Sequence, residues 1–180
     1  YEIVSRDWSS DVCSSDLLAV DVGYGQLAWP VRTDERVTPV ERTNVRTLAP
    51  EDLPYRPSLV VADLSFIPLE LVLPALVSVV QDDADLLLMV KPQFEVGRER
   101  VGDGVVRDPQ LRASAVVGVA EAAVVAGLGV AGVAASPLPG PSGNVEYFLW
   151  LQRRGGRATV GLTGDDLVEA VQRAVTEGPA

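Results

Sequence analysis

Three stretches of this chain each place a charged residue at the edge of an apolar run with the length of a β-strand. The stretches are VVADLSF, VKPQFE and PSGNVEYF, and the charged residues are Asp63, Lys91 and Glu146. In an open parallel sheet, ligands bind and chemistry takes place at the ends of the strands. Two carboxylates and an amine that arrive there together predict a site that handles protons.

Length and composition indicate one globular domain. The chain has 180 residues, of which 47% are hydrophobic and 22% are charged, which is enough to bury a core. Its net charge of -10 argues against this chain alone binding a polyanion, because affinity for nucleic acid comes largely from lysine and arginine. No apolar run approaches the roughly 20 residues that a membrane span needs, so we predict a soluble protein.

Cysteine and histidine are almost missing from the sequence. Cys13 is the only cysteine, and there is no histidine. This composition excludes a disulfide framework and a thiolate metal site, and we expect no metal. It also fits a reducing cytoplasm.

The first residues differ in character from the rest. The segment Tyr1–Leu17 has no apolar period, and it matches the translation of a sequencing-library adapter. Segments of this kind say nothing about a fold. We expect residues 1–17 to be an artefact and residues 18–180 to be the protein. The alternative is a natural tail rich in serine and aspartate.

Apolar patterns predict six strands and three helices in the remaining chain. Strands are expected where short apolar runs are bounded by glycine, proline or charged residues, and helices where apolar residues recur at helical spacing. The pair Asp108-Pro109 is a good cap and first turn for one helix. The expected strands are 18–22, 36–41, 58–62, 85–90, 129–135 and 145–152, and the expected helices are 68–80, 108–126 and 163–177.

Apolar strands that alternate with helices predict an α/β fold with a mostly parallel sheet, covered on both faces. The last two strands are joined by a loop rich in proline and glycine. We therefore expect a hairpin there, with an antiparallel strand at the end of the sheet. The strand that ends at Asp21 has the features of a second strand in a nucleotide-binding sheet, where an acidic residue holds ribose hydroxyls. A first strand and its glycine-rich turn would precede it.

Several long stretches resemble the TlyA family of haemolysin-A-like ribosomal RNA 2'-O-methyltransferases, which are related to the FtsJ-type enzymes. The resemblance covers the chain from Leu18 to Ala180. The most specific stretches are AVDVGYGQL (19–27), ERTN (41–44), VADLSF (61–66), VKPQFEVG (90–97) and SPLPGPSGNVE (136–146).

The resemblance implies a Rossmann-like, S-adenosylmethionine-dependent methyltransferase domain that follows a small RNA-binding S4 domain. It implies a Lys-Asp-Lys-Glu active site, three members of which correspond to Asp63, Lys91 and Glu146. The first lysine, the glycine-rich cofactor loop, the first strand and the S4 domain have no counterpart here, so we expect a partial catalytic domain. The loop 101–105 is also one glycine shorter than the loop of the family.

The chemistry of the residues agrees with methyl transfer. S-Adenosylmethionine carries an activated methyl group, so the protein must align a nucleophile and help to remove its proton. A lysine can act as a base or stabilise an oxyanion when burial or a neighbouring cation tunes it. Lys91, which corresponds to the second lysine of the Lys-Asp-Lys-Glu set, is the candidate. Asp63 would orient its amine, and Glu146 would position this lysine or the ribose. We expect Asp21 to bind the cofactor ribose and Asn44 to lie on the adenine side.

Each of these residues also has a purely structural interpretation. Asp63 could cap a helix, Lys91 could lie on the surface at a strand end, and Glu146 could be a solvated position of an alternating strand. Asp21 could form a turn. Three arginines of the 97–108 loop could contact RNA phosphates or simply be solvated: Arg98, Arg100 and Arg107. Three aromatic residues are expected in the core rather than as stacking platforms for bases: Trp29, Phe66 and Trp150.

Three functions compete at this level. The first is methyl transfer to a ribose 2'-hydroxyl, of cytidine, in ribosomal RNA, with ribosomal subunits as partners in the cytoplasm. The second is a non-catalytic module for ribosome binding or assembly. The third is a membrane-active haemolysin, against which the absence of a basic amphipathic helix argues.

The expected lack of a glycine-rich loop leads to a prediction for residues 1–180. We expect this chain to bind S-adenosylmethionine weakly or not at all and to be inactive, since backbone amides that would receive the ligand are missing. Calorimetric titration of residues 1–180 measures this affinity. A dissociation constant below the millimolar range would contradict the prediction.

Overall fold

The computed structural model describes residues 16–140, 142–155 and 161–179. The strands are β1 (Leu17–Val20), β2 (Val37–Val40), β3 (Leu59–Ala62), β4 (Asp85–Val90), β5 (Gly129–Ala135) and β6 (Tyr147–Gln152). The α-helices are α1 (Trp29–Arg32), α2 (Leu73–Val79), α3 (Pro92–Glu95), α4 (Arg98–Val101), α5 (Pro109–Val125) and α6 (Gly164–Glu177). Three short 3-10 helices complete the description: η1 (Val45–Thr47), η2 (Pro50–Asp52) and η3 (Leu69–Leu71).

The six strands lie where the sequence predicts them, and two have the predicted bounds. Asp108 caps α5 as expected, because its side chain accepts the N–H of Gln110. The helix predicted over residues 68–80 is divided into η3 and α2. Pro74 stands in the first turn of α2, where its missing N–H costs nothing, whereas inside one continuous helix it would remove a hydrogen bond.

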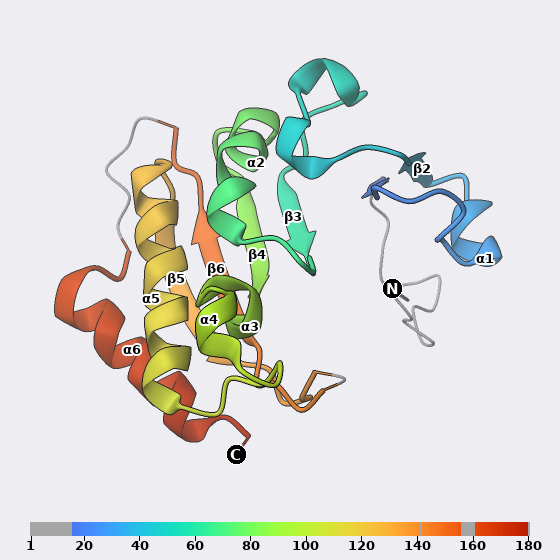
Figure 1. Ribbon diagram of the computed structural model, residues 1–180. Helices are drawn as coiled ribbons and strands as arrows, with labels where there is room; N and C mark the ends of the chain where they lie inside the picture. Colours follow the sequence, from blue (N-terminus) through green and yellow to red (C-terminus); the bar gives the residue numbers. More distant parts are fainter. Residues whose placement is uncertain (1–15, 141, 156–160, 180) are drawn as a thin grey trace.

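The strands form two sheets rather than one. Strands β1 and β2 pair in parallel, and the other four follow the order β3-β4-β6-β5. The gap between the two sheets separates β1, which ends before Asp21, from β3, which ends before Asp63. Figure 1 shows the β1–β2 unit, with α1, standing beside the β3 edge of the larger sheet. This division falls where a first strand is expected. The structure describes only Leu17 and the residue before it from the segment 1–17, and Leu17 begins β1.

The position of the antiparallel strand corrects the sequence prediction. Strands β5 and β6 form the expected hairpin, but β6 inserts between β4 and β5, so that β5 is the edge strand. The pattern of apolar residues cannot reveal this order, because β4 and β6 are both apolar enough for the centre of a sheet. The mostly parallel character is confirmed, since β3, β4 and β5 run in one direction and β6 alone runs against them.

One face of the larger sheet carries the core. Alternate residues of β4 and β6 face α2, α5 and α6 and are fully buried (Figure 1). The opposite face carries residues that are half-buried or exposed, so the prediction that both faces are covered is wrong for the described residues. The buried row consists of Leu86, Leu88, Val90, Tyr147, Leu149 and Leu151. Every helix in the described ranges is too short or too polar to cross a bilayer.

Candidate active site

Asp63, Lys91 and Glu146 meet at one edge of the four-stranded sheet. Asp63 follows the last residue of β3, and Lys91 follows the last residue of β4. Glu146 precedes β6, which runs in the opposite direction, so the start of β6 lies beside the end of β4. The register shows this directly, because Val90 pairs with Tyr147. The sheet topology therefore brings together three residues that are distant in the sequence.

The amine of Lys91 forms ion pairs with both carboxylates. Its Nζ lies 2.7 Å from Oδ1 of Asp63 and 3.7 Å from Oε1 of Glu146, and it donates to Oγ of Ser65 at 3.2 Å. The side chains of Lys91 and Glu146 are each 8% exposed, and that of Asp63 is 53% exposed. A charge this deeply buried is tolerated when it is paired. Asp63 is thus the side of the cluster that solvent and ligands can reach.

Lys91 is the only lysine among the 180 residues, whereas the chain has 14 arginines. Arginine keeps its proton under all conditions that proteins meet, and lysine can release it. The one cation that could take part in proton transfer therefore lies in this cluster. Its neighbour Pro92 keeps the backbone of Lys91 extended and begins α3, because a residue before proline avoids the helical region.

The carboxylate of Glu146 is held by neighbours on two sides. Nε2 of Gln93 lies 3.5 Å from its Oε1, a long contact. A Cβ atom at Gly140 would lie only 2.9 Å from the same oxygen, so the backbone of Gly140 packs directly against the carboxylate. The carbonyl of Glu146 accepts the N–H of Ser136. Any larger residue at position 140 would displace the carboxylate.

Phe66 stands exposed beside Asp63 and Ser65. Its side chain is 78% exposed, and its backbone has a φ of 66°. A bulky residue in this left-handed region is strained, and such strain is often found at functional sites. Its ring contacts that of Phe94, with centroids 5.0 Å apart. The expectation that Phe66 belongs to the core is wrong, and Trp29 and Trp150 are likewise exposed.

Asp21 and Asn44 occupy the corresponding edge of the β1–β2 unit. Asp21 follows β1, and its carbonyl accepts the N–H of Thr43, next to Asn44. Oδ1 of Asp21 accepts the N–H of Gly23 at 2.6 Å, so Asp21 does form a turn. Oδ1 of Asn44 caps η1 through Arg46. The two residues lie near each other, in a different sheet from Asp63, Lys91 and Glu146.

The geometry decides between several of the alternatives for the first three residues. Asp63 caps no helix, because η3 begins at Leu69 after Pro68. Lys91 and Glu146 are buried, so neither is a solvated surface charge. Ser65 and Gln93 are additional members of the site that sequence reasoning missed, although both lie within the quoted stretches. Their spacing of two residues from Asp63 and Lys91 was the available signal.

The arginines of the 97–108 loop form no part of the cluster around Lys91 in the described structure. Arg107 is exposed and pairs with Asp103, four residues earlier in the same loop. The side chains of Arg98 and Arg100 lie outside the described part of the structure. The interpretation of these arginines as RNA contacts stays a prediction.

Comparison with known proteins identifies the family. The sequence profile of the FtsJ-like methyltransferases matches residues 8–153. The chain belongs to the FtsJ-like methyltransferase family. It is 58% identical, over 92% of its length, to the 16S/23S rRNA (cytidine-2'-O)-methyltransferase TlyA of Mycobacterium tuberculosis. The expected family and the α/β methyltransferase fold are therefore confirmed.

Solved structures of two proteins described as hemolysins are also similar to this FtsJ-like chain. One is from Streptococcus thermophilus, with a TM-score of 0.81 and 37% identity over 89% of this chain and 58% of that chain. The other is from Lactococcus lactis, with a TM-score of 0.78 and 37% identity over 89% of this chain and 76% of that chain. The chain spans 61% of the length of the mycobacterial relative.

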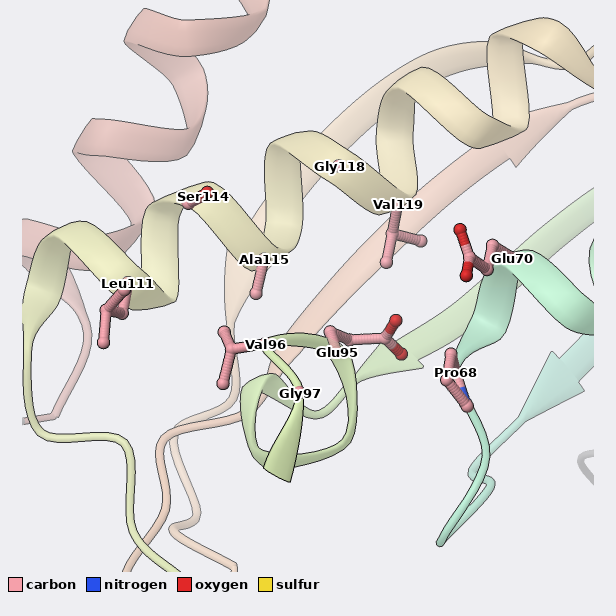
Figure 2. A pocket seen from close by; sticks show the side chains of 10 residues that line it. All are labelled: Pro68, Glu70, Glu95, Val96, Gly97, Leu111, Ser114, Ala115, Gly118 and Val119. Atoms are coloured by element: carbon pink, nitrogen blue, oxygen red, sulfur yellow. The ribbon is translucent and has the colours of Figure 1, made fainter. Parts of the chain in front are cut away.

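A pocket of about 410 Å³ lies apart from the three charged residues of the FtsJ-like domain. Figure 2 shows it between α5, α3 and the segment at η3, with the carboxylates of Glu70 and Glu95 at one end. Asp63, Lys91 and Glu146 do not line it. Glu95 accepts the N–H of Leu69 at 3.0 Å. Burial, together with a smaller contribution from the nearby Glu70, raises the pKa of Glu95 from its usual 4.5 to about 7, although the hydrogen bond from Leu69 acts in the opposite direction.

The raised pKa of Glu95 predicts that stability falls as pH rises. Between about pH 4.5 and 7 the folded state holds a proton that the unfolded state has lost, so unfolding becomes easier with increasing pH. We expect Glu95→Gln, which keeps an acceptor for Leu69, to raise the free energy of unfolding at pH 8 by about 1–2 kcal/mol, allowing for solvent screening. Urea denaturation at pH 5 and pH 8 measures it. An equal effect at both pH values would contradict the prediction.

Proposed function

We propose that the protein transfers the methyl group of S-adenosylmethionine to the 2'-hydroxyl of a cytidine ribose in ribosomal RNA. The observation that carries the proposal is the buried Lys91, paired with Asp63 and Glu146 at the strand ends of an FtsJ-like fold. The 58% identical mycobacterial relative is a 16S/23S rRNA (cytidine-2'-O)-methyltransferase by name, which supports the choice of nucleotide and of the methylated position. Ribosomal subunits would be the partners, and the reaction would take place in the cytoplasm.

The residues present fit the methyl donor. When bound, S-adenosylmethionine supplies a methyl group on a positively charged sulfur. Asp63, Lys91 and Glu146 together carry one net negative charge, which suits a cationic ligand. Asp21 would hold the ribose, since its Oδ2 accepts no hydrogen bond from a described residue. Asn44 would lie toward the adenine, with its Nδ2 available as a donor.

The chain's own residues would activate the RNA hydroxyl. A ribose hydroxyl is a poor nucleophile until its proton leaves or its developing negative charge is stabilised. Lys91 Nζ would meet the 2'-oxygen and either accept its proton, as a neutral amine, or stabilise the oxyanion, as an ammonium group. Asp63 and Ser65 fix the direction of the amine, and Glu146 forms a second, longer ion pair with it. Fixing the amine in this way lowers the cost of orienting it in the transition state.

Phe66 supports the choice of a nucleic acid as substrate. RNA-binding proteins stack unpaired bases on exposed aromatic rings. Phe66 lies three residues after Asp63, and its exposed ring is backed by Phe94. A base that leaves its stack could lie on this ring while its ribose approaches Lys91. The net charge of -10 means that other segments or partners would supply the cationic surface for the RNA phosphates.

A non-catalytic module for ribosome assembly is the second candidate. It would keep the fold and bind RNA without turnover. The ion pairs of Lys91 with Asp63 and Glu146 argue against a decayed site, because a buried charge without a task is costly to retain. Vesicle leakage that is unaffected by Lys91→Ala would instead favour the haemolysin function.

Replacement of Lys91 tests the proposed reaction. We expect Lys91→Ala to lower the rate of methyl transfer about 100- to 10,000-fold, since loss of a proton-transfer group costs this much, with unchanged affinity for S-adenosylmethionine. The assay follows labelled methyl transfer to ribosomal RNA in the full-length protein, meaning a chain of the relatives' length that contains this sequence. The product is mapped to a 2'-oxygen.

Two further variants sharpen this test. Lys91→Arg keeps the charge but cannot accept a proton, so residual transfer in this variant would assign Lys91 to oxyanion stabilisation. Arg173→Ala removes an exposed cation from α6 and should leave the rate unchanged. Methyl transfer at the normal rate by Lys91→Ala would show that Lys91 takes no part in the reaction. No transfer by a folded wild-type protein that binds the donor would favour the assembly module.

Replacement of Phe66 tests the contact with a base. Stacking of one base on an aromatic ring is worth roughly 1–3 kcal/mol, so we expect Phe66→Ala to raise the KM for RNA about 5- to 150-fold. The affinity for S-adenosylmethionine should not change. Phe66→Leu keeps an apolar side chain without the ring and should resemble Phe66→Ala. An unchanged KM in both variants would show that Phe66 does not contact a base and has a purely structural role.

A further inference from the structure

Asn144 joins two loops at the edge of the sheet that carries Lys91. The first is the 102–106 loop, which follows α4. The second is the β5–β6 loop, residues 136–146, which ends at Glu146. Figure 1 shows the two loops side by side at the lower end of the sheet. Asn144 is only 3% exposed, so its amide must find partners within the protein.

The side chain of Asn144 binds the first loop through both of its polar atoms. Its Oδ1 accepts the buried N–H of Val106 at 2.9 Å, and its Nδ2 donates to the carbonyl of Gly104 at 2.8 Å. These bonds span about 40 positions of the sequence. Gly104 itself has a φ of 96°, which favours glycine. The pair of bonds therefore defines both the place and the local shape of the 102–106 loop.

The backbone of Asn144 acts on the Glu146 side of the site. Its carbonyl accepts the N–H of Gly140 at 2.8 Å, and the carbonyl of Gly140 accepts the N–H of Gly143. This turn holds Gly140 against the carboxylate of Glu146, which any larger residue at position 140 would displace. Asn144 thus contacts the wall of the Glu146 site through its main chain and the 102–106 loop through its side chain.

We infer that Asn144 is a positioning residue, which fixes the 102–106 loop and the Gly140 turn so that together they bound the Lys91 site on its Glu146 side. The inference rests on the proposed methyl transfer. RNA that enters the site on this side passes the 102–106 loop, and the carboxylate of Glu146 stays aimed at Lys91. Asn144 itself does not touch the reacting atoms, since both of its side-chain bonds go to backbone groups of the loop.

The variant Asn144→Asp separates positioning from simple stability. A carboxylate can still accept the N–H of Val106, but its second oxygen faces the carbonyl of Gly104 and repels it. Burial and the facing carbonyl raise the pKa of a carboxyl group at this position, and the protonated form restores a donor toward that carbonyl. In the full-length protein we expect Asn144→Asp to lower kcat/KM for RNA at least 10-fold at pH 8. The ratio to the wild type should recover as the pH falls to 6, with unchanged affinity for S-adenosylmethionine.

Gln110→Glu is the matched control. It adds the same charge near the same loop, at an exposed position of α5 whose side chain makes no hydrogen bond with a described residue. It should stay within twofold of the wild type at both pH values. Loss of activity in Asn144→Asp that is the same at every pH, or shared by Gln110→Glu, would overturn the inference. So would wild-type efficiency of Asn144→Asp.

Hydrogen exchange distinguishes failure of the inference from failure of the proposed function. In Asn144→Ala the amide of Val106 loses its acceptor, so its exchange should become at least 10-fold faster, and trypsin should cleave faster after Arg107. Exchange in the core strand β4 should not change. If the wild type transfers no methyl group, the proposed function fails and the exchange of Val106 still decides the placement of the loop. Unchanged exchange at Val106 would overturn the inference.

Discussion

A buried ammonium group must be paired, and this requirement organises the catalytic edge of the larger sheet. Lys91 is almost fully enclosed, and three neighbouring side chains each supply an oxygen: Asp63, Ser65 and Glu146. Removing a charge from water costs several kcal/mol unless partners replace the water. The strand ends, the direction of β6 and the close packing of Gly140 all serve to bring these oxygens within reach. The arrangement that compensates the cost of burying the charge of Lys91 also orients its amine.

The insertion of β6 between β4 and β5 is the topological step on which the site depends. If the antiparallel strand lay at the outer edge, Glu146 would be one strand further from Lys91, about 4.8 Å more across the sheet. Its central place makes Val90 and Tyr147 direct partners, so the residues just beyond them become neighbours. The hairpin loop before β6 then necessarily lies over the site. Asn144 uses that position to tie in the loop that follows α4.

Most elements and the three charged residues could be predicted from the sequence, because they depend on local patterns. Asp63, Lys91 and Glu146 stand at the ends of recognisable apolar runs, and the parallel topology brings such ends together. Strand order, the exposure of Phe66 and the contacts of Asn144 could not be predicted. They arise from pairing between distant segments and from a left-handed backbone at Phe66 that its own side chain disfavours. The aromatic residues illustrate the limit, since hydrophobic character alone assigned them to the core.

Division of the strands between two sheets also divides the proposed chemistry. Asp21 and Asn44, the residues proposed for the methyl donor, follow β1 and β2, whereas the residues proposed for the hydroxyl follow β3 and β4 and precede β6. Methyl transfer needs the two groups in line, with near-contact between the reacting atoms. At the edge of the four-stranded sheet, the apolar Leu59 and Val61 of β3 are exposed. An exposed apolar edge strand readily accepts another strand. A strand paired there, as the sequence predicts for the first strand of such a sheet, would cover β3 and fix the donor residues relative to Lys91 through continuous backbone hydrogen bonds. The accuracy of the reaction geometry would then depend on the sheet itself rather than on any single side chain.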